Sequence, residues 1–225
     1  MIEEGKSLGL FFGYKTDGVF QSWDEINACE ALNPDMPYQQ KFSYDKLSPG
    51  DIKLLDLSGD GYVNLKTNNY EDMTVLGSSL PDFTGGMSTR FTWKWFTLSA
   101  QASFSYGNMK SWEAEGSQFT FNPNRPKNLL SLALNRWTPE NPTNKYPKIK
   151  LNATSYGMTD FWLHDASYLK IQNISLTYRM PSNWLNKIGF LNRLELFASV
   201  NNVYTFTDYP GPNPESYDAS NRIAG

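Results

Sequence analysis

The sequence predicts an all-β fold, an antiparallel meander that forms part of a transmembrane β-barrel. The eleven residues Phe96 to Tyr106 alternate apolar and polar side chains without exception, which is the period of a β-strand. This length crosses the hydrocarbon layer at a tilt, and aromatic residues stand at both ends. The other face carries only Thr, Ser and Gln, which suits a polar lumen. A strand of a soluble β-sandwich is the alternative, but its outer face usually carries charged residues.

Three more segments alternate in the same sense. Residues Phe83 to Trp93 precede a tight turn at Lys94-Trp95 and predict a hairpin with the first strand. A second, more weakly alternating pair follows near the C-terminus, joined by a longer turn in which Trp184 and Phe190 are candidate interface anchors. The expected membrane strands are, in order, residues 83–94, 95–107, 166–180 and 192–206.

Long segments separate these strands. Because outer-membrane barrels have short periplasmic turns and long external loops, residues 22–80 and 107–163 are expected to be external loops. They follow a strand-like start at Leu8–Gln21 and contain candidate short helices at Asp24–Leu32 and Lys127–Trp137. Four membrane strands, or six if the ends contribute, cannot close a barrel, which needs about eight. The functional barrel is therefore expected to include more chain.

Composition excludes several classes of protein. Aromatic residues make up 15% and charged residues 19%, and a net charge of -3 without charge runs gives no footprint for nucleic acid. The single cysteine, Cys29, allows neither an intrachain disulfide nor a cysteine zinc site. The sequence contains no run of about 18 apolar residues, so no membrane helix is predicted. The first residues lack the apolar stretch of a signal peptide, so the export signal is expected upstream.

One segment resembles the first half of a calcium-binding loop. Its candidate ligands, at positions one, three, five and seven of such a loop, are Asp56, Ser58, Asp60 and Tyr62. The twelfth position is Thr67 rather than the usual Glu, so Glu71 or Asp72 would have to supply the missing carboxylate. The alternative, which we favour, is a tight turn whose Asp and Ser side chains bond to their own backbone. Calcium is the only cofactor that the sequence suggests.

No arrangement of residues predicts an enzyme. His164 is the only histidine and stands in no nucleophile motif, so we expect it to have a packing or surface role. The acidic pairs Glu113/Glu115 and Glu71/Asp72 match a glycosidase only if they face each other across a sugar, and solvated loop charge is the simpler interpretation.

Aromatic residues are frequent in the second long loop. They are Trp112, Phe119, Phe121, Trp137 and Tyr146. Such side chains stack on sugar rings, pack against a partner protein, or form the core of a compact loop. We favour packing for most of them and assign no substrate-binding residue.

Several blocks, in order along the chain, carry a resemblance to a known family. They are Gly13–Gln21, Pro49–Lys53, Asp56–Gly61, Gly77, Pro81, Gly85-Gly86, Trp137–Pro142, Ser167–Tyr178, Asn201–Gly211 and Pro214-Glu215. The ordered set resembles the C-terminal part of the SusC/RagA family of TonB-dependent outer-membrane transporters of Bacteroidetes. Two departures are Lys170-Ile171-Gln172-Asn173, where the family usually has Arg-Leu-Lys-Asn, and the ending at Gly225 without the family's final aromatic strand.

The resemblance implies a longer parent protein with a barrel of about 22 strands, whose plug and TonB-binding segment are absent from these residues. It also implies a SusD-like surface lipoprotein as partner, TonB as the energy source, and an oligosaccharide or peptide as substrate. The expected function is therefore nutrient import across the outer membrane, with this chain supplying barrel wall and external loops. A secreted glycan-binding β-sandwich is the alternative from another class, and a glycoside hydrolase fragment is a weaker one.

Overall fold

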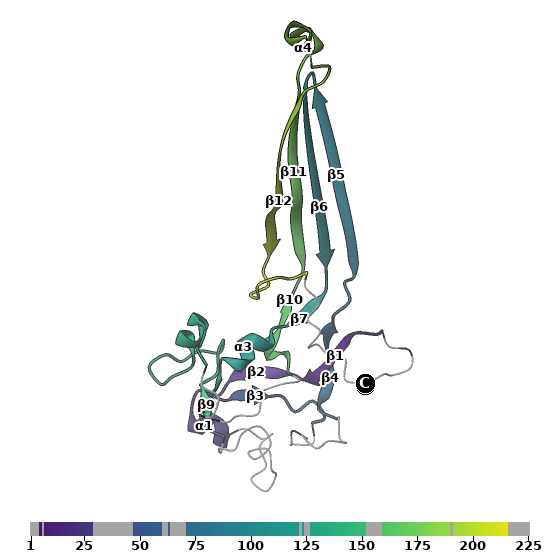
Figure 1. Cartoon of the computed structure of the whole chain (residues 1–225). Coiled ribbons are helices and arrows are strands. Elements are labelled where there is room, and N and C mark those ends of the chain that lie inside the picture. The colour runs from purple at the N-terminus through teal and green to yellow at the C-terminus, as the bar shows by residue number, and fades with distance from the viewer. Residues whose placement is uncertain are drawn as a thin grey trace. The chain divides into compact units, whose positions relative to one another are not determined.

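The computed structural model describes most of the chain and divides it into two compact units (Figure 1). The described residues are 5, 7–28, 47–59, 63, 71–121, 123, 127–151, 159–189 and 191–215. The sheet unit comprises Leu80–Met109 and Asp165–Tyr217, and the second unit, here called the loop unit, holds the rest. Strands predominate and the helices are few and short, as the sequence predicted.

The sheet unit is built on four long antiparallel strands. They are β5 (Phe83–Trp93), β6 (Phe96–Tyr106), β11 (Tyr168–Arg179) and β12 (Glu195–Thr207). Their order is β12-β11-β6-β5, so each strand lies beside its neighbour in sequence (Figure 1). This order is the meander that the alternating segments predicted.

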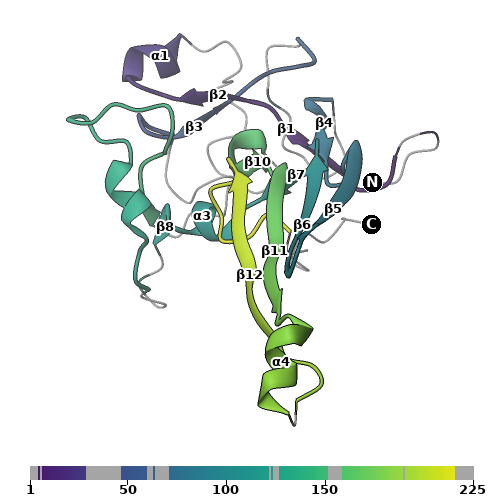
Figure 2. The same cartoon turned by 90° about the horizontal axis from the view of Figure 1, so that it is seen from above.

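Both connections at one end of this sheet are much shorter than the connection at the other end. Lys94, with φ +53, and Trp95 form the whole turn between β5 and β6. The β11–β12 connection holds the helix α4 (Ser182–Ile188), which ends at Gly189 in the left-handed conformation (Figure 2). At the other end, about sixty residues separate β6 from β11, yet the two strands pair along nearly their full length. We call the first end the turn end and the second the loop end.

The observed strands begin and end within about three residues of the predicted ranges. That these strands cross a membrane stays a prediction. A regular register extends through the whole β5–β6 hairpin, because both strands keep strict alternation. In β11 the register shifts between Ile171 and Asn173 against both neighbours. This bulge lets Ile171 and Ile174 point to the same face although they are three residues apart.

One face of the sheet is apolar and exposed. It carries Phe83, Met87, Phe91, Trp93, Phe96, Leu98, Leu169, Leu176, Leu196, Val200, Tyr204 and Phe206. Leu98, near the turn end of β6, is 44% exposed, and Met87, in the middle of β5, is 68% exposed. A β-sandwich would bury this face against a second sheet. Among the described residues no such covering is found, so the structure favours the barrel interpretation over the sandwich.

The loop unit contains short strands rather than an irregular coil. It holds β1 (Leu10–Tyr14) paired with β4 (Met73–Ser78), β2 (Thr16–Val19) with β3 (Ile52–Leu54), and β8 (Thr120–Phe121) with β9 (Lys150–Leu151). The strands β7 (Met109–Ser111) and β10 (Leu163–Asp165) also pair, and each contains a point where the chain passes between the units. The predicted strand at Leu8–Gln21 is thus two strands, β1 and β2.

The helices of the loop unit are shorter than the sequence predicted. The helix α1 (Trp23–Asn27) begins after Ser22, whose hydroxyl accepts from the Glu25 amide, and residues 29–32 of its predicted range lie outside the described residues. The α-helix expected over Lys127–Trp137 is wrong, since only Ser131–Asn135 forms a 3-10 helix, η1. Two other short helices are α3 (Glu113–Ser117) and the 3-10 helix η2 (Asp160–Trp162). In the described part of the chain, no helix has the length and apolarity to cross a membrane.

The loop unit has its own hydrophobic core. Its buried members are Tyr14, Phe20, Ile26, Leu47, Ile52, Leu54, Val63, Phe119 and Trp162. Phe119 lies at the centre, with its ring stacked between Tyr146 at 5.3 Å and Trp162 at 5.4 Å. Residues from both predicted external loops therefore pack together in one folded body.

Candidate functional site

The apolar face of the sheet is bordered by aromatic pairs at both ends. At the loop end, Phe83 stacks on Tyr106 with ring centroids 5.0 Å apart, and Tyr204 meets Phe206 edge to face at 4.6 Å. At the turn end, Phe96 lies 4.9 Å from Tyr178. Aromatic girdles flanking an apolar band are typical of the lipid-facing surface of outer-membrane strands. The geometry thus fits a surface that contacts lipid.

The opposite face of the sheet carries small polar side chains that bond across the strands. Asn173 donates to Asn201 at 2.7 Å, and Gln172 donates to the Ser103 hydroxyl at 3.0 Å. Near the turn end, Glu195 accepts from Arg179 at 2.6 Å. Phe197 departs from this pattern, since it belongs to the polar face and is 78% exposed. Apart from Phe197, the polar face is one that water can wet.

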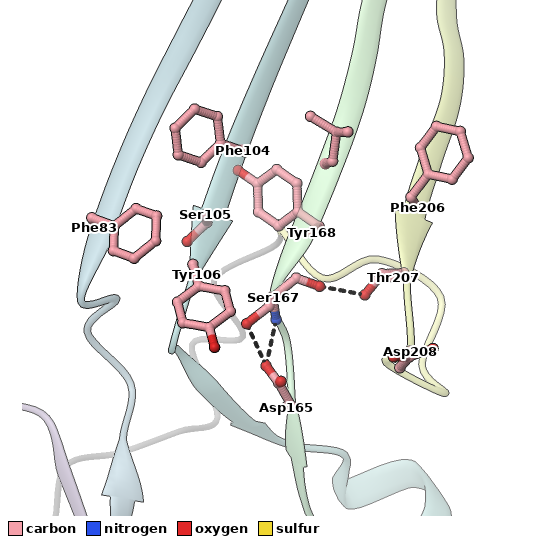
Figure 3. Close-up of a pocket in the computed structure, with 11 residues that line it drawn as sticks. Phe83, Phe104, Ser105, Tyr106, Asp165, Ser167, Tyr168, Phe206, Thr207 and Asp208 are labelled. Atoms are coloured by element: carbon pink, nitrogen blue, oxygen red, sulfur yellow. Dashed lines mark hydrogen bonds between the residues drawn. The ribbon is translucent and has the colours of Figure 1, made fainter.

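A cavity of about 530 Å³ opens at the loop end of the sheet (Figure 3). Its lining combines aromatic and polar side chains, namely Phe83, Phe104, Ser105, Tyr106, Asp165, Ser167, Tyr168, Leu169, Phe206, Thr207 and Asp208. The polar groups bond to one another, because Asp165 accepts from the amide and hydroxyl of Ser167, at 2.8 and 2.5 Å. The Thr207 hydroxyl donates to the Ser167 carbonyl at 2.8 Å. The Thr207 bond ties the end of β12 to the start of β11, and the Asp165 bonds fix the turn that precedes β11.

This cavity offers no catalytic arrangement. His164, the only histidine of the chain, is not among the residues that line it. Its Nε2 lies 2.5 Å from Oε2 of Glu115, a carboxylate that is almost completely buried. Glu115 therefore has a structural partner, and of its predicted pair only this member can be placed, since nothing is described of the Glu113 side chain.

The calcium-loop prediction is only partly covered by the described residues, because Asp60, Tyr62 and Thr67 lie outside them. Oδ1 of Asp56 accepts from the Ser58 hydroxyl at 3.0 Å and from the Gly59 amide at 2.8 Å. These bonds are those of an Asx turn. Among the residues that can be placed, no group of three or more His, Cys, Asp or Glu side chains is arranged to hold a metal.

Asp72, which we considered as the missing carboxylate of that loop, does lie beside it. Its side chain is fully buried, and its Oδ1 accepts from the amides of Leu57 at 3.2 Å and Ser58 at 3.1 Å. Hydrogen bonds from backbone amides to a carboxylate are strong, so Asp72 helps to hold the loop in place. The geometry supports the tight turn that the sequence favoured.

Most aromatic residues of the second long loop pack inside the loop unit. Phe119 and Trp137 are buried and Tyr146 is partly buried, whereas Phe121 is exposed. Nε1 of Trp137 donates to Oε1 of Gln21 at 2.9 Å, and Nε2 of Gln21 donates to the Val19 carbonyl at 2.6 Å. The packing interpretation is thus supported for these three residues.

Blocks that carried the family resemblance meet in this core. Gly50 has φ +93, and a Cβ on it would lie 2.6 Å from the Trp137 ring. Glycine is therefore required here for two reasons: the backbone has a positive φ, and a Cβ would collide with the Trp137 ring. Sequence reasoning did not foresee that Pro49–Lys53 packs against Trp137–Pro142. The only available signal was the glycine itself.

Comparisons with known proteins agree with this architecture. TonB-dependent receptor P39 of Formosa agariphila is 32% identical over 255 residues, covering 99% of this chain and 23% of that protein. TonB-dependent receptor P3 of the same organism is 27% identical over 216 residues, covering 96% and 19%. No protein-family model matches the sequence.

The fold is also similar to solved structures. The RagAB peptide transporter matches with a TM-score of 0.63 and 21% identity, over 91% of this chain and 20% of that chain. The RagAB peptide importer in its open-open state matches with a TM-score of 0.60 and 19% identity, over 95% and 21%. The chain therefore spans about a fifth of the length of the proteins that it matches.

A sheet with one exposed apolar face bordered by aromatic residues is typical of a β-structured membrane protein. The chain is homologous to TonB-dependent receptors and shares its fold with part of the RagAB structures, as the resemblance indicated. Such receptors are outer-membrane proteins and not enzymes, so the predicted outer-membrane location and the prediction that the chain is not an enzyme are confirmed.

Proposed function

We propose that the chain is the C-terminal part of a TonB-dependent importer. In this proposal β5, β6, β11 and β12 are wall strands of a barrel of about 22 strands. The loop unit, with the predicted loops 22–80 and 107–163, lies outside the cell. The plug, the TonB-binding segment and the other strands belong to the remainder of the protein.

The observation that carries the proposal is the exposed apolar face on strands of membrane length. The four strands have 11 to 13 residues each. About 9 to 11 tilted residues cross the hydrocarbon layer, and the residues beyond them reach the interfaces. β5 and β12 are the edges of this sheet, and unpaired edges are costly in lipid. Both edges are therefore proposed to pair with further strands of the barrel.

The proposed substrate is an oligosaccharide or a peptide, delivered by a SusD-like surface lipoprotein. RagAB, whose fold the chain shares, is named a peptide importer, which supports the peptide alternative without excluding the other. The loop unit supports the lipoprotein partner, since it is folded and presents apolar side chains to solvent. Leu129, Leu130 and Leu134 are exposed around η1 and are the proposed contact.

The membrane wall is tested by a pair of arginine substitutions in the full-length protein. Ala100→Arg places a charge on the apolar face near the middle of β6, and an arginine near the bilayer centre costs about 2–4 kcal/mol. Ser99→Arg places the same charge on the polar face one residue away. We expect Ala100→Arg to reduce folded protein in the outer membrane and Ser99→Arg to leave it unchanged. Equal loss from both would overturn the assignment of the two faces.

Import is tested by growth and uptake in the native host. Cells carrying the gene are supplied with labelled oligosaccharide and peptide mixtures, and accumulation is compared with a strain lacking the gene and with one lacking TonB. We expect one substrate class to require both. Uptake of both classes without this gene would contradict the proposed function.

A further inference from the structure

The charged side chains of the sheet unit are largely segregated by sign between its two ends. The loop end carries four acidic residues and one basic residue, which are Asp82, Asp165, Asp208, Glu215 and Lys170. The turn end carries five basic residues and one acidic residue, which are Arg90, Lys94, Arg179, Lys187, Arg193 and Glu195. The acidic group at the turn end, Glu195, is already engaged, since it bonds to both Arg179 and Arg193.

The tryptophans of the sheet unit lie at the same end as the basic residues. The three tryptophans of the sheet unit are Trp93, Trp95 and Trp184, and each is about half exposed. The amide of Arg179 donates to the Trp95 carbonyl at 2.8 Å, which fixes the β5–β6 turn beside the end of β11. Figure 1 shows α4, with Trp184 and Lys187, at this same end of the sheet. Nζ of Lys94 lies 5.0 Å from the Trp93 ring centroid.

This combination is the chemistry of an interface with anionic lipid. Tryptophan places its amphipathic ring at headgroup depth, and lysines beside it attract negative headgroups. The surface continues directly from the apolar face through Trp93 and Phe96. The headgroup of a lipid whose acyl chains cover the apolar face would therefore lie beside these tryptophans and lysines. Lysine stems also follow the apolar surface while the ammonium group reaches the interface.

From this geometry we propose that the turn end binds anionic phospholipid headgroups of the inner leaflet of the outer membrane. The binding surface comprises Trp93, Lys94, Trp95, Trp184, Lys187 and Arg193. The leaflet follows from the two-residue β5–β6 turn at this end, because short turns of outer-membrane barrels face the periplasm and the long connections face outward. The inference rests on the proposed function, which places the apolar face in a membrane.

Two matched pairs of lysines test this inference in the full-length protein. The test variant is Lys94→Gln/Lys187→Gln, which removes two exposed lysines of the turn end. The control variant is Lys127→Gln/Lys145→Gln, which removes two exposed lysines of the loop unit. Each protein is reconstituted in vesicles of equal phosphatidylglycerol and phosphatidylcholine, released with mild detergent, and its retained lipids are counted by native mass spectrometry.

We expect the wild type and the control to retain phosphatidylglycerol in preference to phosphatidylcholine. In the test variant we expect this preference to fall by about fivefold for each lysine removed. An unchanged preference in the test variant overturns the inference. A preference reduced equally in both variants also overturns it, since the effect would then be one of total charge.

Two further arms separate the inference from the proposals on which it rests. Flotation with vesicles of phosphatidylcholine alone tests membrane insertion without any anionic lipid. A wild type that floats but shows no preference for phosphatidylglycerol refutes the inference and leaves the proposed function standing, whereas a wild type that does not float refutes both. Repeating the measurement with lipopolysaccharide tests the leaflet. Loss of lipopolysaccharide retention in the test variant, with phosphatidylglycerol retention kept, refutes the assignment to the inner leaflet.

Discussion

Asp51 and Lys150 form a buried ion pair in the loop unit, with Oδ2 and Nζ 2.5 Å apart and side chains only 1% and 5% exposed. Asp51 precedes β3 and Lys150 begins β9, so the pair joins the two predicted external loops. The Ser48 amide donates to the same Oδ2 at 2.9 Å, and Lys148 lies 3.7 Å from Oδ1. Burial makes this pair costly to break, because either charge left alone has lost its water.

We therefore expect Lys150→Met to destabilise the loop unit by about 3–5 kcal/mol. Lys148→Met is the control, since its longer contact and partly exposed side chain leave less to lose. Hydrogen exchange of the Phe20 amide, which donates to the Asp51 carbonyl, measures the effect in the full-length protein. Equal exchange in both variants would show that Lys150 is not the principal partner of Asp51.

Gly85 makes room for the ring of Phe104 on the apolar face. A Cβ on Gly85 would lie 2.6 Å from Cζ of Phe104, so Gly85→Ala must displace the ring from its edge-to-face contact with Phe83. We expect a loss of about 0.5–1.5 kcal/mol, the worth of an aromatic pair. The readout is the temperature at which the folded protein loses its compact migration on a detergent gel. Gly86→Ala is the control, because its Cβ has 3.5 Å to the Ala102 carbonyl and should leave that temperature unchanged.

The turn at Asp56 is expected to be independent of calcium. Asp56→Ala removes the acceptor of the Ser58 hydroxyl and the Gly59 amide, and should destabilise the turn by about 1 kcal/mol. Addition of calcium or of a chelator should leave the thermal unfolding of the wild type unchanged. A calcium-dependent rise that disappears in Asp56→Ala would favour the metal-binding loop instead.

Gln21 is expected to stabilise the packing of Trp137. Gln21→Leu leaves the indole N–H of a buried ring without its acceptor, which costs about 1–3 kcal/mol. Trp137→Phe removes the N–H itself, so Gln21→Leu should cost less in that background. A double-mutant cycle on the free energy of local opening measures the coupling. Additive effects would show that the hydrogen bond contributes little.

The sequence was sufficient for the sheet where local alternation was strict. In β5 and β6 every residue from Phe83 to Trp93 and from Phe96 to Tyr106 keeps its face, so the hairpin could be predicted almost to the residue. In β11 the bulge near Gln172 interrupts the period, which explains the weaker pattern there. Strict alternation fixes which side chains share a face, and a single inserted residue moves all those after it to the other face.

The loop unit could not be predicted in the same way. Its core joins Tyr14, Phe119 and Trp162, which are far apart in sequence and follow no period. The 3-10 helix η1 begins only at Ser131, because Leu130 has an extended backbone, and its amide donates to the Gln118 side chain at 2.9 Å. The segregated charges of the sheet unit were visible in the sequence, but they acquire meaning only when the strand order brings them to two ends.

Two hydrogen bonds join the chain just after β6 to the chain just before β11. The Gly107 amide donates to the Ser167 hydroxyl at 2.9 Å, and the Ala166 amide donates to the Asn108 carbonyl at 2.8 Å. Joining two residues sixty positions apart carries an entropy cost that grows only slowly with the length between them. Insertions or deletions in the segment between β6 and β11 should therefore cost little in the pairing of these strands. The segment can thus diverge in length and sequence among relatives while the register of the sheet is kept.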